Sequence, residues 1–296
     1  MSFKDIPSLA SKVAIVTGAN SGIGLVTARE LAKHDCHVIL ACRSRERAEP
    51  VVKALESEIT NTTGKVEFMQ LDMMSLKSIK QFVDEFKAKN LPLHILVNNA
   101  GIMAVPFQLS VDGIESQFAT NHVGVMALTT SLLPLLESSA PARIVCVSSA
   151  AHKWAPESGI DFENINNEAN YSKYTAYGQS KVATILFTRE LHRQLRERGI
   201  TNIHVNAVHP GVVQTNLFRE QPWIIRKLLS LFQRSEDNGA KTQLYCATSE
   251  DIVKNDWSGR YFEPIAKLSE SSAISQDMEL AKKLWTFTEE LIAKST

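Results

Sequence analysis

The feature that most restricts the fold of this chain is an alternation of short apolar runs with longer amphipathic ones. Six runs are nearly continuous in apolar character: 12–17 (KVAIVT), 37–42 (HVILAC), 65–71 (KVEFMQL), 93–99 (LHILVNN), 143–149 (RIVCVSS) and 202–208 (NIHVNAV). Helical patterns lie between them at 22–34, 44–59, 75–89, 112–138 and 174–198. Continuous apolar runs suit parallel strands that are covered on both faces, and their alternation with helices indicates βαβ units.

This order predicts a single domain over residues 1–296, because no internal repeat, low-complexity tract or Pro/Gly-rich linker divides the chain. The fold class expected is α/β, a doubly wound parallel sheet with helices on both faces. From about residue 212 the chain adds helices and a last strand, 259–263 (GRYFE).

Composition argues against several classes of partner. Lys plus Arg equals Asp plus Glu at 32 each, so a neutral chain gives no electrostatic reason to bind nucleic acid or an anionic membrane. The four cysteines have no paired spacing, and the eight histidines form no metal-ligand pattern. There is no signal-peptide core and no run of bilayer-spanning length. We expect no metal, no nucleic-acid partner and a cytoplasmic location.

A glycine-rich loop, 17–24 (TGANSGIG), lies between the first strand and the first helix. Gly18, Gly22 and Gly24 allow a tight turn and let backbone N–H groups approach an anion closely. The following helix points its positive end at the same place, so a pyrophosphate is the natural occupant. A turn with a purely structural role is the alternative.

Three phenols fall in one polar segment, 167–181 (NEANYSKYTAYGQSK). Only Tyr177 has a lysine, Lys181, four positions ahead, whereas Tyr171 and Tyr174 have none there. Residues four apart share one face of a helix. An ammonium group beside a phenol stabilises its anion, which indicates either a catalytic device or a polar helix face.

Six motifs in order resemble the short-chain dehydrogenase/reductase family: TGANSGIG (17–24), NNAG (98–101), Asn121, VSS ending at Ser149, YGQSK (177–181) and HPG (209–211). ACRS, NNAGIM, FATNHVG and VSSAAH are similar to the retinol-dehydrogenase-like branch. The resemblance extends from about residue 10 to 265. It implies a Rossmann-type domain, a nicotinamide cofactor and hydride transfer between this cofactor and a small-molecule carbonyl or alcohol.

The end of the second strand selects between the two nicotinamide cofactors. An acidic residue there binds the ribose hydroxyls and repels a 2′-phosphate. Here Cys42 is followed by Arg43, and the first acid is Glu46, inside the next helix. Since a guanidinium can pair with a phosphate through two hydrogen bonds, we predict NADP(H). The alternative is that Arg43 merely begins a solvated helix that also holds Arg45 and Arg47.

The resemblance implies the other cofactor contacts. Asp72 and Met73 would lie along the adenine, Asn98 and Ala100 along its ribose, and Gly101 would permit close approach. The complete predicted set is Gly18, Asn20, Ser21, Gly22, Ile23, Gly24, Arg43, Asp72, Met73, Asn98, Ala100, Gly101, Tyr177, Lys181, Pro210, Val213 and Thr215.

The catalytic set implied by the resemblance is Asn121, Ser149, Tyr177 and Lys181. Ser149 would hold the substrate oxygen. Tyr177 would act as general acid or base, which requires a pKa nearer 7 than its ordinary value of ~10. Lys181 would lower that pKa and bind the nicotinamide ribose. Asn121 would hold a proton-relay water, and because asparagine is a poor helix former it also indicates a local irregularity; a side-chain cap in a kinked helix is the alternative.

Two segments bear on the substrate. Residues 215–234 are rich in apolar residues among Arg and Lys, which predicts a substrate lid at about 212–235, with peripheral membrane contact as an addition. An ordinary core helix is the alternative. The insert 152–173 is expected to bring Trp154 and Phe162 to the same opening. We predict a lipophilic retinoid-, steroid- or aldehyde-like substrate. A catalytically silent NADPH-binding regulator is the alternative function, and homodimer formation stays open.

Overall fold

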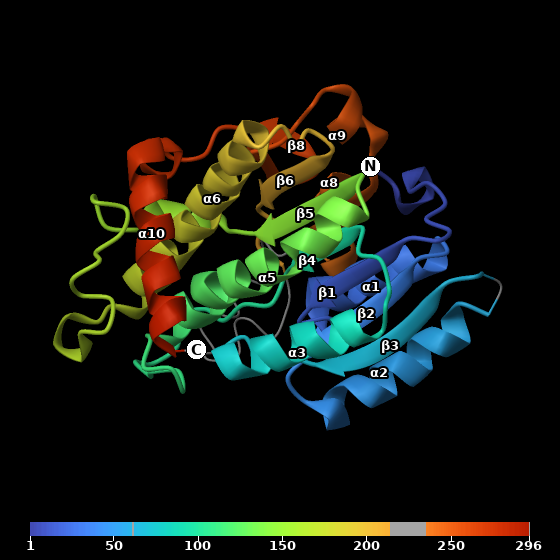
Figure 1. The fold of residues 1–296 in the computed structure, drawn as a ribbon, viewed down its shortest axis with the longest axis horizontal. Helices are drawn as coiled ribbons and strands as arrows, with labels where there is room; N and C mark the ends of the chain where they lie inside the picture. The colour runs from blue at the N-terminus through green and yellow to red at the C-terminus, as the bar shows by residue number, and fades with distance from the viewer. Residues whose placement is uncertain (61, 214–234, 296) are drawn as a thin grey trace.

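Eight strands form one sheet, in the order β3-β2-β1-β4-β5-β6-β7-β8 (Figure 1). The computed structural model describes residues 1–60, 62–213 and 235–295. The strands are β1 (Val13–Thr17), β2 (His37–Cys42), β3 (Lys65–Gln70), β4 (Ile95–Asn98), β5 (Ala142–Val147), β6 (Ile203–Val208), β7 (Arg260–Glu263) and β8 (Lys267–Ser269). All neighbours pair in parallel except β7 and β8, which are antiparallel. The predicted fold class is confirmed.

Two layers of helices cover the sheet. The described helices are α1 (Gly22–Lys33), α2 (Arg45–Glu58), α3 (Leu76–Ala88), α4 (Ser116–Phe118), α5 (Gly124–Ser138), α6 (Lys173–Glu197), α8 (Glu236–Thr248), α9 (Glu250–Lys254) and α10 (Met278–Ser295). In Figure 1, α3, α5, α6 and α10 lie on one face, and α1 and α8 lie on the other. The strand order reverses between β1 and β4, which is where ligands bind in open α/β sheets.

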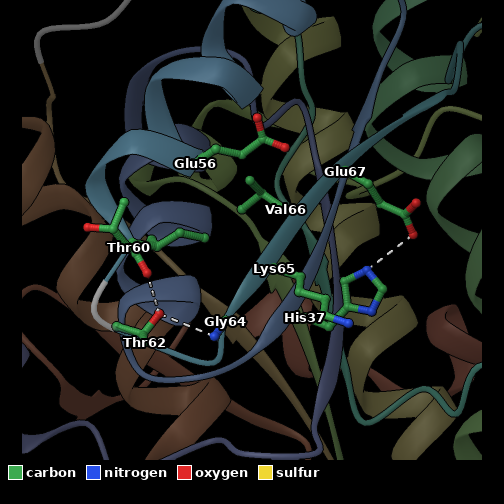
Figure 2. A pocket seen from close by; sticks show the side chains of 9 residues that line it. His37, Glu56, Thr60, Thr62, Gly64, Lys65, Val66 and Glu67 are labelled. Atoms are coloured by element: carbon green, nitrogen blue, oxygen red, sulfur yellow. Dashed lines mark hydrogen bonds and ion pairs between the residues drawn. The ribbon is translucent and has the colours of Figure 1, made fainter.

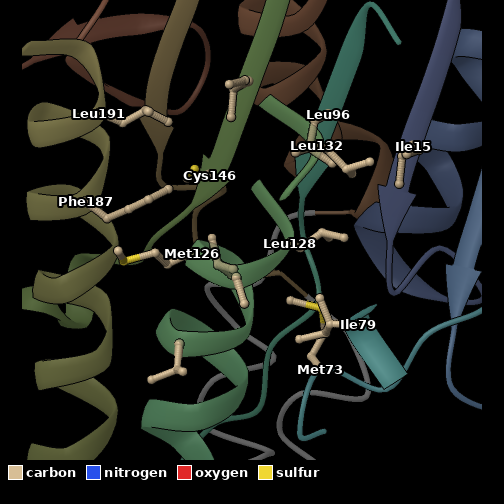
Figure 3. Packing of buried hydrophobic residues seen from close by; sticks show 14 of the residues in the cluster. Ile15, Met73, Ile79, Leu96, Met126, Leu128, Leu132, Cys146, Phe187 and Leu191 are labelled. Carbon is tan, nitrogen blue, oxygen red and sulfur yellow. The ribbon is translucent and has the colours of Figure 1, made fainter. Parts of the chain in front are cut away.

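The hydrophobic core is divided in two by the sheet. Ile15 in β1 packs toward α3, α5 and α6, whereas its neighbours Ala14 and Val16 pack toward α1 and α8, as alternation along a strand requires. Figure 3 shows the first half, with Ile79, Leu96, Leu128, Cys146 and Phe187 in contact around β4 and β5. All four cysteines are buried free thiols.

The helical pattern predicted over 112–138 begins four residues later than expected, at Ser116, and is irregular. The segment begins as α4, continues as one turn of π-helix, η2 (Ala119–Val123), and only then becomes α5. Asn121 lies in the middle of the π-helical turn, which is the irregularity that its low helix propensity indicated. Glu115 caps α4, since its side chain accepts hydrogen bonds from the backbone of Gln117 and Phe118.

The C-terminal helix α10 packs across the outer surface of α6. Phe187 of α6 stacks on Trp285 with ring centroids 5.7 Å apart, and Phe162 of the insert meets Phe287 at 5.0 Å. Phe162 therefore contacts α10 and does not face the substrate opening, contrary to prediction. The expected lid, 215–234, lies outside the described residues. Within the described part of the chain, no helix has both the length and the apolar character that a bilayer crossing requires.

Candidate active site

A cleft of about 550 Å³ opens at the carboxyl ends of the strands. The loops that follow β1, β2, β3, β4, β5 and β6 all contribute to its lining, as the switch in strand order predicts. A second hollow, of about 490 Å³, lies at the amino ends of β2 and β3 (Figure 2). Its polar groups include His37, whose Nε2 lies 3.2 Å from Oε1 of Glu67. The first cleft, at the carboxyl ends of the strands, contains most of the candidate catalytic and cofactor-binding residues that were predicted from the sequence.

Most of the predicted site residues line this cleft. They are Gly18, Asn20, Ser21, Gly22, Ile23, Gly24, Arg43, Asp72, Met73, Ala100, Gly101, Ser149, Tyr177, Lys181, Pro210 and Val213. Asn98 and Asn121 are not among the lining residues, and Thr215 lies outside the described part of the chain. No cluster of metal-ligating side chains occurs among the described residues.

The glycine-rich loop is shaped for close contact. Gly18 and Gly22 have φ of +66° and +60°, which other residues adopt only with strain. A Cβ on Gly24 would lie 2.4 Å from Nδ2 of Asn99. Ser21 is the N-cap of α1 but makes no side-chain cap hydrogen bond, which leaves its hydroxyl and the first amides of the helix for a ligand.

Asn98 was assigned to the wrong surface. Its side chain is 2% exposed, and its Nδ2 donates to Oγ1 of Thr129 at 2.9 Å on the core side of β4. Because side chains alternate along a strand, Asn98 shares the inward face of Leu96. The residue that lines the cleft is Asn99, and its Nδ2 donates to the carbonyl of Thr17 at 2.8 Å. Counting alternation from Leu96 would have found it.

Two buried acceptor atoms test whether a nucleotide cofactor fits. Oδ1 of Asn99 and Oγ1 of Thr120 are buried in the cleft wall and have no hydrogen-bond partner among the described residues. Buried polar atoms of this kind are normally satisfied. Together with the uncapped start of α1, they make the cleft fit for a polar dinucleotide. Sequence reasoning missed both Asn99 and Thr120.

The three arginines after β2 do not share one environment. Arg43 and Arg47 line the cleft. Arg45 points away, because its guanidinium pairs with Glu49 at 2.9 Å and lies over the ring of Phe68. The alternative that Arg43 begins a solvated helix with Arg45 and Arg47 describes Arg45 but not Arg47, which lines the cleft.

The catalytic candidates Ser149, Tyr177 and Lys181 converge at the end of β5. Ser149 follows the strand in extended conformation, and its side chain forms a hydrogen bond with Tyr177. Nζ of Lys181 donates to the carbonyl of Val147 at 2.9 Å and lies 5.5 Å from the centre of the Tyr177 ring. The hydroxyl of the neighbouring Ser148 is not available to the substrate, because it donates to the carbonyl of Lys181 at 2.9 Å.

Burial governs the acidity of this pair. It raises the pKa of Tyr177 to about 12, although the hydrogen bond with Ser149 opposes the shift. Burial also lowers the pKa of Lys181 to about 8. In the protein without cofactor, desolvation thus dominates the acidity of the phenol. The lowering expected from Lys181 together with a bound oxidised nicotinamide stays a prediction.

Asn121 connects two walls of the cleft from behind. Its Oδ1 accepts from the backbone N–H of Ile102 at 3.0 Å, and its Nδ2 donates to the carbonyl of Ile102 and to Oγ of Ser180, both at 2.9 Å. A Cβ on Gly101 would lie 3.1 Å from Oδ1 of Asn121 and 3.5 Å from Nζ of Lys181. The side chain of Asn121 therefore holds the loop after β4 against α6.

The other two phenols of the segment have different surroundings. The hydroxyl of Tyr171 accepts from Nε2 of Gln117 at 2.7 Å and lies 2.9 Å from the carbonyl of Val105 and 3.2 Å from Oε1 of Glu115. Tyr174 lines the cleft mouth, where it is 37% exposed. No local sequence pattern indicates the bonds of Tyr171, since its partners are more than fifty residues away in the chain.

The mouth of the cleft is largely apolar. Met103, Ala104 and Ala151 cluster with Tyr177 just beside the phenol. Trp154, which is 49% exposed, meets Tyr174 edge to face with centroids 6.1 Å apart. Trp154 reaches the opening as predicted.

Comparison with known proteins decides the family. The family model described as short chain dehydrogenase matches residues 12–161 and 164–223. The chain belongs to the short-chain dehydrogenase/reductase family. It is therefore an oxidoreductase of a family whose fold carries a nicotinamide cofactor. The resemblance to the retinol-dehydrogenase-like branch is confirmed as well.

Several curated relatives match this chain over most of their own length. The short-chain dehydrogenase TIC 32 A, chloroplastic, of Brassica napus is 43% identical over 94% of this chain and 88% of that protein. Retinol dehydrogenase 14 of Mus musculus is 41% identical, over 95% and 86%. The WW domain-containing oxidoreductase of Homo sapiens is 40% identical, over 95% and 68%.

Solved structures agree on the fold. An uncharacterized protein from Mycobacterium paratuberculosis superposes with a TM-score of 0.80 at 35% identity, over 99% of this chain and 97% of that one. The RhlG/NADP active-site complex of Pseudomonas aeruginosa has a TM-score of 0.66 at 23% identity, over 86% and 95%. At that identity the second likeness speaks for the fold alone.

Proposed function

We propose that this protein is an NADP(H)-dependent oxidoreductase that transfers a hydride between the nicotinamide and a lipophilic carbonyl or alcohol. The observation that carries the proposal is one cleft with two ends of different chemistry. Ser149, Tyr177 and Lys181 meet at one end. At the other, Arg43 and Arg47 follow β2, and among the described lining residues the only carboxylate is Asp72, after β3.

A bound nicotinamide cofactor supplies or accepts the hydride. The glycine-rich loop and the start of α1 bind its phosphates, while Arg43 and Arg47 attract a 2′-phosphate. Ser149 and Tyr177 bind the substrate oxygen, and Tyr177 delivers a proton to it when a carbonyl is reduced. With its pKa raised by burial, the phenol holds this proton at neutral pH. Lys181 lowers the cost of the phenolate that remains, and Asn121 holds the loop that flanks it.

The NADP(H) preference is tested by measuring dissociation constants for NADPH and NADH. We expect Arg43→Ala to weaken NADPH by about 1.5–3 kcal/mol, the range for a hydrogen bond to a charged group, and to leave NADH nearly unchanged. Arg47→Ala should act in the same direction. Arg45→Ala is the matched control, because that guanidinium already pairs with Glu49. Equal affinity of the wild type for both cofactors would defeat the proposal.

Turnover is tested with NADPH oxidation as the readout. Tyr177→Phe should bind NADPH nearly normally and lose at least the ~10²–10⁴-fold that a positioned acid contributes. If the wild type binds NADPH but does not oxidise it in the presence of any carbonyl tested, the result would favour the regulatory alternative.

The substrate class is supported by the apolar wall that the lining residues Met103, Val105 and Ala151 form and by the aromatic pair Trp154 and Tyr174. Such a mouth cannot offset the desolvation of a heavily hydroxylated substrate. The names of the retinol dehydrogenase relatives point the same way.

A series of straight-chain aldehydes tests this substrate class. Catalytic efficiency should rise with chain length, by up to ~0.8 kcal/mol per buried methylene, until the cleft is full. A flat series, with sugars turned over better, would contradict the proposal. A cytoplasmic location, membrane contact and a homodimer stay predictions.

A further inference from the structure

We propose that His152 is a positioning residue for Ser149, and that its ring couples the catalytic serine to the segment just before α10. The proposal rests on the function proposed above for Ser149. It goes further in assigning a task to His152, which ends the VSSAAH motif but belongs neither to the implied catalytic set nor to the cleft lining.

The ring of His152 lies between the end of β5 and the C-terminal part of the chain. The side chain is 1% exposed. Its Nδ1 lies 2.7 Å from the carbonyl oxygen of Ser149, and its Nε2 accepts from the backbone N–H of Ser272 at 3.1 Å. The face of the ring is covered by Tyr261 of β7, edge to face at 5.3 Å.

These partners fix the tautomer. A backbone N–H can only donate, so Nε2 of His152 must be the acceptor and carries no proton. The proton of the neutral ring is then on Nδ1, which donates it to the carbonyl of Ser149. Burial lowers the pKa of His152, which favours this neutral form; the charged groups that act on the ring are Lys153 and Glu263.

The carbonyl of Ser149 is held twice. It accepts the ring N–H of His152 at 2.7 Å and the backbone N–H of the same residue at 3.1 Å. A peptide held this firmly restricts the rotation of Ser149, whose hydroxyl must meet both the substrate oxygen and Tyr177. Small displacements of a catalytic group cost rate more than they cost binding. The effect of His152 should thus fall on kcat.

Two substitutions separate the two hydrogen bonds. In His152→Asn the side-chain amide can still donate to Ser149 but cannot reach Ser272. In His152→Gln the carbonyl oxygen can reach Ser272, and the bond to Ser149 is lost. The matched control is His204→Gln, the same change at a buried histidine near the amino end of β6, far from the cleft.

We expect His152→Gln to lower kcat about tenfold, as the loss of one strong hydrogen bond would, with KM for NADPH unchanged. His152→Asn should keep kcat within about twofold of wild type while its Tm falls. His204→Gln should lower Tm alone. Equal kcat in the Asn and Gln variants, or a similar loss of kcat in His204→Gln, would overturn the proposal.

A spectroscopic measurement keeps the proposal testable whatever the activity. Nitrogen-15 NMR of histidine-labelled protein distinguishes the two ring tautomers, and the signals of His152 are those missing from the His152→Asn spectrum. We expect the proton on Nδ1; a proton on Nε2 would overturn the inference even if turnover is normal. If instead Ser149→Ala leaves turnover unchanged, the proposed function fails, while the tautomer result still stands or falls by itself.

Discussion

At the scale of single residues, Lys181 is a charged side chain whose burial in the site is unfavourable. Its ammonium group is enclosed with one backbone acceptor, the carbonyl of Val147, and a phenol that stays neutral. Burial without a counter-ion disfavours the charged form, which is why the pKa of Lys181 falls to about 8. This cost is present before any substrate arrives, as expected of a group kept for chemistry rather than stability.

Lys181→Met should therefore be more stable than wild type at neutral pH. The difference between about 8 and the ordinary pKa of 10.5 corresponds to roughly 3 kcal/mol. Between these pH values the unfolded wild type keeps a proton that the folded protein has released, so wild-type stability rises with pH. The advantage of Lys181→Met should shrink by up to that amount between pH 8 and 10.5, measured by urea unfolding without cofactor. An advantage that does not change with pH would show that Lys181 is not neutralised by burial.

At the scale of elements, a hydrogen-bond network fixes the loop that forms the apolar wall. Oε1 of Gln117 accepts from the backbone N–H of Ala104 at 2.7 Å, and Tyr171 reaches the carbonyl of Val105. The buried carboxylate of Glu115, which caps α4, forms hydrogen bonds with both the backbone of Gln117 and the hydroxyl of Tyr171. Tyr171 of the insert thus supports the substrate side of the cleft from outside, while Trp154 of the same insert lines the mouth.

Tyr171→Phe should loosen this wall while leaving the cofactor half intact. Removing the hydroxyl leaves buried acceptors unpaired, which costs about 1–3 kcal/mol. We expect that loss in urea unfolding, a higher KM for the carbonyl substrate and an unchanged Kd for NADPH. Tyr245→Phe is the matched control, since its hydroxyl bonds to Asp251 at the surface and should cost little. A changed Kd for NADPH in Tyr171→Phe would place the network elsewhere in the mechanism.

The elements also show why part of the molecule followed from sequence and part did not. The spacing of apolar residues indicates the parallel strands and the helices between them, so their order and most of their bounds were predictable. Strand β8 has three residues, two of them exposed, and offers no such period. The error of one position between Asn98 and Asn99 arose from ignoring alternation. The bonds of Tyr171, and the bond between His152 and Ser272, join residues distant in sequence, which no local pattern encodes.

At the scale of the whole molecule, α10 is joined to the π-helical turn beside the site. Nε2 of His122 lies 2.8 Å from Oγ1 of Thr288, whose hydroxyl donates to the carbonyl of Leu284. Because the hydroxyl proton of Thr288 already points to Leu284, Nε2 of His122 must be the donor to Oγ1 of Thr288. Burial lowers the pKa of His122 to about 3, so the ring is neutral. The last helix is thereby part of the core and not an appendage.

Thr288→Val should destabilise the fold by about 1–3 kcal/mol, because it leaves the buried N–H of His122 unpaired. Thr288→Ser retains the hydroxyl and should restore most of the stability. The measurement is the free energy of urea unfolding for both variants. If Val were no worse than Ser, the contact would contribute packing alone.

The position of α10 has a consequence for how the protein is made. A ribosome delivers β1 to β6, and with them every described residue of the cleft, before it delivers the helix that covers α6. Domains generally form from the N-terminus during synthesis, and contacts between distant segments form slowly. His122 and Thr288 are 166 residues apart. The apolar side of α6 in the nascent chain is therefore exposed to solvent until α10 emerges. We expect a chaperone to bind it during this interval.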